Sequence, residues 1–241
     1  MRGLGTIINV LGIVGGGLLG LLFGKKIHEK FRDTLMTAIG VCVLFLGIGG
    51  TMEQMLHVNG SQLSSSGSLM VIISMALGTV IGELLNLDGK IERFGEWLKV
   101  KTKSQSDNLF VEAFVSASLT VCIGAMAVVG SIRDGIYGDY TILAAKALLD
   151  AIIIMIMTAA SGKGCIFSAI PVALFQGFCT LIAVFIQPIL TEEALSNLSY
   201  VGSILIFCVG VNIVWDKKIR VANILPSIVI AVCAAFLHIG N

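Results

Sequence analysis

Residues 4–24 of the chain read LGTIINVLGIVGGGLLGLLFG, a run without a single charged side chain. As an α-helix, which rises about 1.5 Å per residue, such a run reaches roughly 30 Å, the thickness of the hydrocarbon core of a bilayer. Its few polar side chains, Asn9 among them, carry no charge that lipid would exclude. The stretch therefore predicts a membrane-spanning helix.

The same apolar pattern recurs along the whole chain. Of 241 residues, 56% are hydrophobic and 13% are charged, whereas a typical soluble domain has about 25% charged residues. The 28 glycines and three prolines suit helices that pack closely through small residues. The sequence predicts an all-α, polytopic transmembrane bundle that forms one domain over residues 1–241. The eight expected spans are residues 4–24, 34–51, 68–87, 109–130, 141–160, 165–187, 200–215 and 221–239.

The distribution of basic residues predicts the orientation of these spans. Loops on the cytoplasmic side of a membrane protein carry an excess of Lys and Arg. With the amino terminus outside, 13 of the 16 Lys and Arg fall in cytoplasmic loops. Both termini are therefore expected outside the cytoplasm. The 13 residues are Lys25, Lys26, Lys30, Arg32, Lys90, Arg93, Lys99, Lys101, Lys103, Lys163, Lys217, Lys218 and Arg220.

The long connection between the third and fourth spans, residues 88–108, has an amphipathic pattern. Ile91, Phe94, Trp97 and Leu98 share one face of a helix, and the basic side chains lie elsewhere around it. We expect a helix over about 89–100 that lies on the membrane surface as an anchor. A partner-binding role is the alternative.

Short glycine patterns indicate internal repeats. Gly16 and Gly20 in the first span are echoed by Gly78 and Gly82 in the third, which runs in the same direction. The pattern of 40–49 in the second span is echoed by 202–210 in the seventh, which runs in the opposite direction. Inverted repeats are typical of secondary transporters, whose substrate site lies near the midplane. Chance recurrence of common apolar residues is the alternative.

Two charged residues lie within the fifth expected span. Lys146 and Asp150 are four residues apart, so they share a helix face and can form an ion pair. Asp150 lies roughly 14 Å along the helix from Thr141, close to the midplane. Buried charges in a membrane mark either a structural ion pair or a proton or cation relay site. The sequence is consistent with both interpretations.

A glycine-rich, charged segment precedes this pair. Residues 130–139 contain three glycines together with Arg133, Asp134 and Asp139. The segment is either an ordinary outer loop or a re-entrant segment whose Arg133 and Asp134 line a water-filled cavity. Further polar residues within expected spans are candidate interhelical hydrogen-bonding groups or solute contacts. They are Asn9, Gln176, Asn212 and Asn223.

Other classes of function have no support in the sequence. It contains no HExxH, GxSxG or phosphate-binding glycine motif, so no enzymatic activity is expected. The six cysteines lie in apolar runs without metal-binding spacing, so neither a metal nor another cofactor is expected. A net charge of +1 gives no basic excess for nucleic acid. The expected partners are the lipid bilayer, an unidentified small solute or ion, and a second copy of the chain in a homodimer.

Four segments in order resemble one known family. GTIINV at 5–10, GAMAVVGSIRDG at 124–135, KALLD at 146–150 and VANILP at 221–226 are similar to motifs of the domain of unknown function 554 family. The resemblance implies a multipass protein of the bacterial inner membrane, without an established activity and with a presumed transport role. The positions that match the family's motif are Asn9, Ser131, Asp134, Lys146, Asp150 and Asn223.

Two positions depart from the family pattern. The family commonly has proline where this chain has Ala125, and glutamine where it has Arg133. The first departure weakens the idea of a proline-broken fourth span, and the second adds a positive charge beside Asp134. The leading hypothesis is a small secondary transporter, coupled to protons or cations through Asp150 and Asp134. The alternatives are a membrane scaffold with structural charges and an ion channel.

Overall fold

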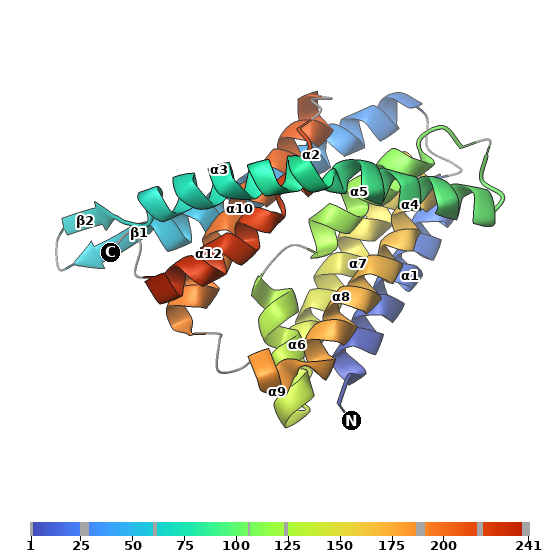
Figure 1. Cartoon of the computed structure of the whole chain (residues 1–241). Helices are drawn as coiled ribbons and strands as arrows, with labels where there is room; N and C mark the ends of the chain where they lie inside the picture. Colours follow the sequence, from blue (N-terminus) through green and yellow to red (C-terminus); the bar gives the residue numbers. More distant parts are fainter. Residues whose placement is uncertain are drawn as a thin grey trace.

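The chain folds into helices joined by short connections, with one small antiparallel hairpin in the described part (Figure 1). The structure is a computed structural model, and it describes residues 2–24, 29–59, 62–105, 107–122, 125–186, 191–215 and 219–237. The all-α class is therefore confirmed. The elements are α1 (Leu4–Gly24), α2 (Glu29–Met55), β1 (Leu56–Asn59), β2 (Gln62–Ser65), α3 (Ser68–Leu85), α4 (Leu87–Lys101), α5 (Phe110–Cys122), α6 (Ala125–Tyr137), α7 (Thr141–Ser161), the 3-10 helix η1 (Lys163–Ser168), α8 (Ala169–Leu181), α9 (Ala183–Ile186), α10 (Glu192–Trp215), α11 (Val221–Ile224) and α12 (Pro226–Leu237).

Six helical segments among the described residues are long and apolar enough to cross a membrane. They are α1, α2, α3, α7, η1 with α8, and α10. A seventh span results if α5 and α6, which are inclined at 61° to each other, are counted as one broken span. The eighth expected span corresponds to α11 and α12, which together form a shorter apolar segment, Val221–Leu237.

Glycines let α1 and α7 pack backbone to backbone. A Cβ atom added to Gly12 would lie 2.9 Å from the carbonyl oxygen of Ala147, and one added to Gly20 would overlap the carbonyl oxygen of Met155. Contacts therefore advance along both helices together, so α1 and α7 are parallel. In lipid, such close approach is a main source of helix association, because there is no hydrophobic drive between helices.

The other main helix pairs are antiparallel. Gly40 of α2 faces Ile213 of α10, whereas Gly50, further along α2, faces Ser203. In the same way, Gly78 of α3 faces Ser227 of α12, and Gly82 faces Asn223. These directions agree with eight segments that alternate in direction along the chain.

The parallel packing of α1 and α7 decides how α5 and α6 cross the membrane. Two spans that run in the same direction must be separated by an odd number of crossings. If α2 and α3, which are each long enough, cross once, then α5 and α6 counted as one broken span supply the third crossing. A re-entrant loop in their place would reverse α7 relative to α1.

Residues 130–139 form neither the outer loop nor the re-entrant segment that the sequence suggested. Helix α6 continues through Gly130 to Tyr137, and the span is broken earlier, between Cys122 and Ala125. The glycines serve packing, since a Cβ atom on Gly130 would lie 2.8 Å from the side chain of Leu143, and one on Gly135 would lie 2.5 Å from the carbonyl oxygen of Thr180. The expected loop is reduced to residues 138–140.

Several boundaries also differ from those expected. Helix α2 extends to Met55 and leads into the β1–β2 hairpin, which the sequence pattern did not predict. Helix α10 begins at Glu192, eight residues before the expected start. The predicted amphipathic helix is confirmed as α4, which follows α3 through Asn86, a residue in the left-handed region with φ of 46°. Its position on the membrane surface stays a prediction.

Gly16 gives a direct test of the α1–α7 contact. A Cβ atom there would overlap the carbonyl oxygen of Ala151, so Gly16→Val should destabilise the protein by about 1–3 kcal/mol through overpacking. Gly15 is the matched control, because no atom lies within 4 Å of a Cβ atom built on it. Thermal unfolding in detergent should show a lower melting temperature for Gly16→Val than for Gly15→Val. Equal melting temperatures would contradict the packing.

Cysteine accessibility tests the direction of the spans. Arg2→Cys and Tyr140→Cys precede the parallel helices α1 and α7, so a membrane-impermeant maleimide should label both in intact bacterial cells. Lys101→Cys, at the end of α4, should react only after lysis. Labelling of Arg2→Cys and Tyr140→Cys from different sides would contradict the parallel arrangement. Labelling of both only after lysis would reverse the orientation predicted from the basic residues.

Candidate functional site

Lys146 and Asp150 form a buried ion pair on α7. The Lys146 Nζ atom lies 2.8 Å from Asp150 Oδ1 and 2.7 Å from Asp150 Oδ2. The two residues are only 7% and 3% exposed. The ion pair expected from their spacing is therefore present, and it lies within a span, where each charge would be costly alone.

A third oxygen completes the surroundings of the ammonium group. Lys146 Nζ also donates a hydrogen bond of 2.8 Å to the carbonyl oxygen of Val121. Val121 lies in the last turn of α5, which ends at Cys122, and the last carbonyls of a helix have no partner within it. The partial negative charge at a helix C-terminus favours a cation there. Lys146 thus joins α7 to the end of a half-helix within the membrane.

Asn9 brings α1 to the same place. Its side chain is fully buried and lies beside the Asp150 carboxylate. Within the described residues, neither atom of its amide group forms a hydrogen bond of normal geometry. The Asn9 side chain nevertheless interacts with the Asp150 carboxylate, so it is not without a polar partner. Asn9 is therefore a polar group available at the ion pair.

Gln176 of α8 is buried at 1% exposure, and its amide atoms have no hydrogen-bond partner among the described residues. Gly135 of α6 packs against Thr180 of α8, and both helices are antiparallel to α7. Ser131 lies four residues before Gly135, and Gln176 lies four residues before Thr180. Ser131 and Gln176 therefore lie at the same height in the bundle. Most of the buried side-chain N and O atoms that form no hydrogen bond of normal geometry in the described ranges lie on α1, α6 and α8. They belong to Thr6, Asn9, Asp134, Gln176 and Thr180.

Asp134 lies at the first turn of α1 and makes no described contact with the ion pair. Its Oδ2 accepts a hydrogen bond of 2.8 Å from the backbone N–H of Gly5, and its side chain is fully buried. A carboxylate at a helix N-terminus is favourable, because it accepts from free N–H groups at the positive end of the dipole. Asp134 therefore fixes the start of α1 against α6, one helical turn from Asn9.

Arg133, although adjacent to Asp134, points out of the bundle. Its guanidinium pairs with Asp139 at 2.9 Å, and its side chain is 52% exposed. Hydrogen bonds from Thr141, together with Arg133, hold the pKa of the Asp139 carboxyl below its ordinary value. Arg133 and Asp134 therefore face different directions, because neighbouring residues of a helix are about 100° apart.

Ser131 and Asn223 have local structural partners. The Ser131 hydroxyl is buried and donates to the carbonyl oxygen of Ala127, one turn earlier, at 2.6 Å. Asn223 lies on α11 and accepts a hydrogen bond of 2.7 Å from the backbone N–H of Asp88, at the start of α4. Burial raises the pKa of the Asp88 carboxyl, an effect that Arg220 partly opposes. The structure thus assembles Asn9, Lys146 and Asp150, with Val121, and places Asn223 elsewhere.

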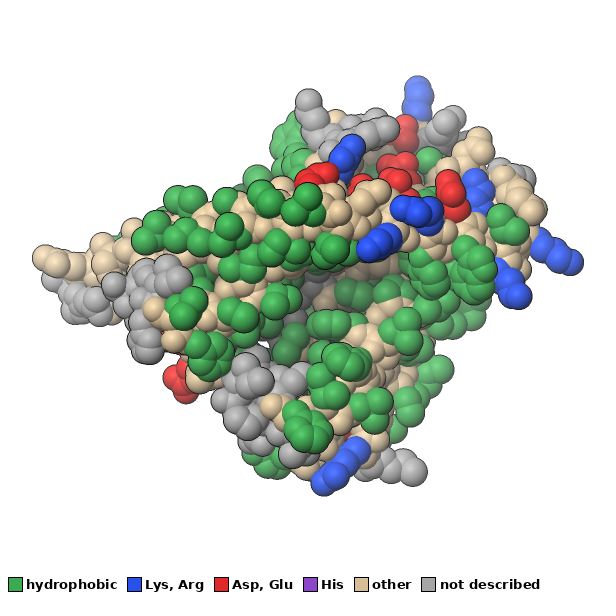
Figure 2. Space-filling model, in the orientation of Figure 1, with side chains coloured by type: hydrophobic (Ala, Val, Ile, Leu, Met, Phe, Trp, Pro, Cys, Tyr) green, Lys and Arg blue, Asp and Glu red, His purple; other side chains and the backbone are tan. Residues whose placement is uncertain are grey.

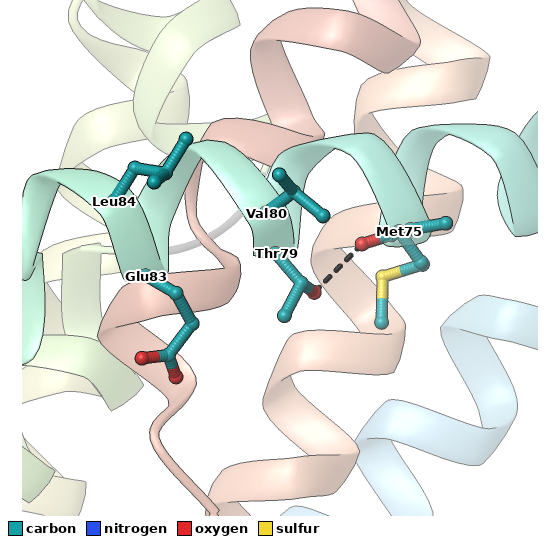
Figure 3. A pocket seen from close by; sticks show the side chains of 6 residues that line it. Met75, Thr79, Val80, Glu83 and Leu84 are labelled. Atoms are coloured by element: carbon teal, nitrogen blue, oxygen red, sulfur yellow. Dashed lines mark hydrogen bonds between the residues drawn. The ribbon is translucent and has the colours of Figure 1, made fainter.

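Two cavities occur away from this cluster. A groove of about 610 Å³ runs along α3, where Met75, Thr79 and Glu83 lie on one side (Figure 3). The Thr79 hydroxyl donates to the Met75 carbonyl, and Glu83 pairs with Arg220 at 3.2 Å. A second pocket of about 300 Å³ lies between the hairpin end of α2 and the start of α10. Neither includes the ion pair.

The fold and this cluster define a polytopic helical membrane protein with a buried ion pair at a broken span. The chain belongs to the family described as protein of unknown function (DUF554), whose model matches residues 4–236. It is 29% identical to the uncharacterized membrane protein YdfK of Bacillus subtilis (strain 168) over 233 residues, which cover 97% of this chain and 96% of that protein.

A second relative is the uncharacterized protein YqgA of Escherichia coli (strain K12). It is 25% identical over 232 residues, which cover 95% of this chain and 94% of the relative. No solved structure matches the chain significantly. The comparisons therefore support the membrane location and the family, and they name no substrate.

Stability measurements test whether the two charges depend on each other. Removing one partner of a buried ion pair typically costs about 3–5 kcal/mol, so Lys146→Met and Asp150→Leu should each lower the unfolding free energy by that amount. The double variant should recover much of the loss, because no charge is left unpaired. Arg133→Ala, which breaks an exposed pair, should cost less than about 1 kcal/mol. Additive losses in the double variant would mean that the pair is not coupled.

Proposed function

We propose that the protein is a small secondary transporter of the bacterial inner membrane, coupled to a proton or cation at Asp150. The observation that carries this proposal is the contact of Lys146 with both Asp150 and the free end of α5. Broken spans with charged groups at their half-helix ends are a recurrent feature of transporter substrate and ion sites. The family is consistent with this role without specifying it.

The ion pair offers a simple way to couple charge to movement. Neutralising Asp150, by a proton or a bound cation, would remove the counter-ion that holds the Lys146 ammonium in place. Because the same ammonium holds the Val121 carbonyl, its displacement would release the end of α5. A ligand shifts a conformational equilibrium only by the difference in its affinity for the two states, and this contact supplies such a difference.

The distribution of charges supports the proposed orientation. In Figure 2, Lys and Arg side chains gather at one edge of the molecule, over α4, while hydrophobic side chains cover much of α3. This edge would face the cytoplasm, and both termini would face away from it. The carboxyl end of α5 and the pair on α7 would then lie within the membrane between the two aqueous sides.

The packing of the echoed glycine segments supports the proposed inverted repeat. Gly47 of α2 packs against the backbone nitrogen of Phe207, and Gly210 of α10 packs against the backbone nitrogen of Leu44. The contact is antiparallel, as a two-fold relation between α2 and α10 would require. A homodimer stays part of the proposal as a separate expectation.

A membrane scaffold is the second candidate, favoured by the closed geometry of the pair. Both carboxylate oxygens of Asp150 lie within 2.8 Å of Lys146 Nζ, as a purely structural pair would have them. The buried Gln176 amide, which has no hydrogen-bond partner among the described residues, supports the transporter instead, because a scaffold gains nothing from polar groups buried without partners.

Proteoliposomes provide the test of transport. The purified protein, with a pH-sensitive dye inside the vesicles, should move protons in response to at least one ion or small metabolite in a screen. Asp150→Asn should reduce that flux at least about tenfold, because the amide cannot release or bind a proton at neutral pH. Asp139→Asn is the matched control, since Asp139 is a partly exposed carboxylate of the α6–α7 connection.

Two outcomes would contradict this proposal. If the parent protein moves no solute, the scaffold becomes the better interpretation. If Asp150→Asn moves the solute as fast as the parent protein, transport does not depend on this carboxylate and the coupling site lies elsewhere.

A further inference from the structure

The Lys146 ammonium has the surroundings of a bound metal cation. Its Nζ atom lies 2.7–2.8 Å from three oxygen atoms, the two of the Asp150 carboxylate and the carbonyl oxygen of Val121. We infer that Lys146 is a tethered ion that occupies a monovalent-cation site formed by Asp150, Val121 and Asn9. The inference rests on the proposed function, which it deepens by identifying the class of ion that the site would accept once the ammonium is removed.

The ligand chemistry selects a hard cation. Carboxylate, backbone carbonyl and amide oxygens are the ligands of hard metal ions, whereas softer ions prefer thiolate and imidazole. Unwound backbone and half-helix C-terminal carbonyls are also the groups that coordinate Na⁺ in transporters with broken spans. The end of α5 at Val121 supplies such a carbonyl.

The charge balance selects a monovalent ion. Asp150 is the one carboxylate in hydrogen-bond contact with Lys146 in the described part of the chain. The ammonium neutralises it, and the pair is buried at 7% and 3% exposure. A divalent ion in the same place would leave an uncompensated positive charge in a medium of low dielectric constant, which is costly. The site therefore fits one unit of positive charge.

Asn9 is separate evidence for the site, because it is a polar group there that Lys146 does not bind. The side chain is fully buried beside Asp150, and its amide oxygen accepts no hydrogen bond within the described residues. An ammonium group has three N–H donors, and all three oxygens that Lys146 reaches belong to other groups. A mobile ion, free of the lysine side chain, would have the buried Asn9 amide beside it as a further polar group.

The tethered ammonium should make the parent protein independent of alkali cations. A chain with a fixed ammonium in the site carries its own counter-ion, so the metal ions in solution should leave the parent protein unaffected. Removing the ammonium while leaving its space should expose the site to those ions. The protein would then change from one independent of alkali cations to one that binds them.

Lys146→Ala gives that change, because it removes the ammonium and opens its volume. Lys146→Met is the matched control, since the similar length of the side chain removes the charge but fills the space. The double variant Lys146→Ala with Asp150→Asn removes the charged ligand. Each purified protein would be melted in NaCl, LiCl or KCl, with choline chloride added to hold the ionic strength constant.

Only Lys146→Ala should respond to the small cations. A ligand that binds only the folded state stabilises that state, and the stabilisation grows with the ligand concentration. The melting temperature of Lys146→Ala should therefore rise saturably with cation concentration, by on the order of 5 °C. Binding of radioactive ²²Na⁺ should follow the same pattern. The parent protein, Lys146→Met and the double variant should show no cation-dependent shift and no saturable ²²Na⁺ binding.

A different pattern would overturn the inference. If Lys146→Ala melts at the same temperature in every salt and binds no ²²Na⁺, Asp150 has become neutral by protonation and no cation site exists. An equal response of Lys146→Met or of the double variant would mean that the cation binds elsewhere. If Lys146→Ala cannot be purified, Lys146→Ser, whose hydroxyl can donate to Asp150, gives the same comparison. If Lys146→Ala binds no cation, the parent protein can still show flux in proteoliposomes. If the parent protein shows no flux, Lys146→Ala can still bind a cation, so the two proposals fail separately.

Discussion

The close contact between α1 and α7 is the constraint on which the rest of the structure depends. Because Gly12 and Gly20 bring the two backbones together, Asn9 comes to lie beside Asp150. The same contact makes the helices parallel, a direction that fits α5 and α6 crossing the membrane once as a broken span. Bulky residues at these glycines would separate the helices and with them the polar cluster.

The broken span explains why a lysine and an aspartate are tolerated within the membrane. A helix that ends in the hydrocarbon region leaves carbonyl groups without partners, and each costs several kcal/mol unless protein or water satisfies it. Lys146 satisfies the carbonyl of Val121, and Asp150 in turn neutralises Lys146. The break, the cation and the anion are thus three parts of one arrangement, in which each compensates for the cost of another.

Composition and periodicity were enough to predict the class of the fold and the ion pair. Long apolar runs show where helices cross, and the spacing of Lys146 and Asp150 follows from helix geometry alone. The Val121 ligand was not predictable, since every residue has a carbonyl and only the broken span frees this one. The role of Gly130 and Gly135 was also missed, because glycine suits a turn and a close helix contact equally well. Which of Arg133 and Asp134 faces inward depends on the rotation of α6, which packing against α8 decides.

The energetics of buried ion pairs bear on the choice between transporter and scaffold. Apolar side chains of similar volume often replace a buried pair without loss of stability, so a scaffold has little need of Lys146 and Asp150. A pair that opens during function has a different requirement, since its separated charges need other polar groups nearby. Asn9 lies beside Asp150, and Asp134 and Thr6 lie within about one turn of Asn9 in the fold. In the proposed transporter, these polar atoms would contact the separated charges in a second state in which the pair is open.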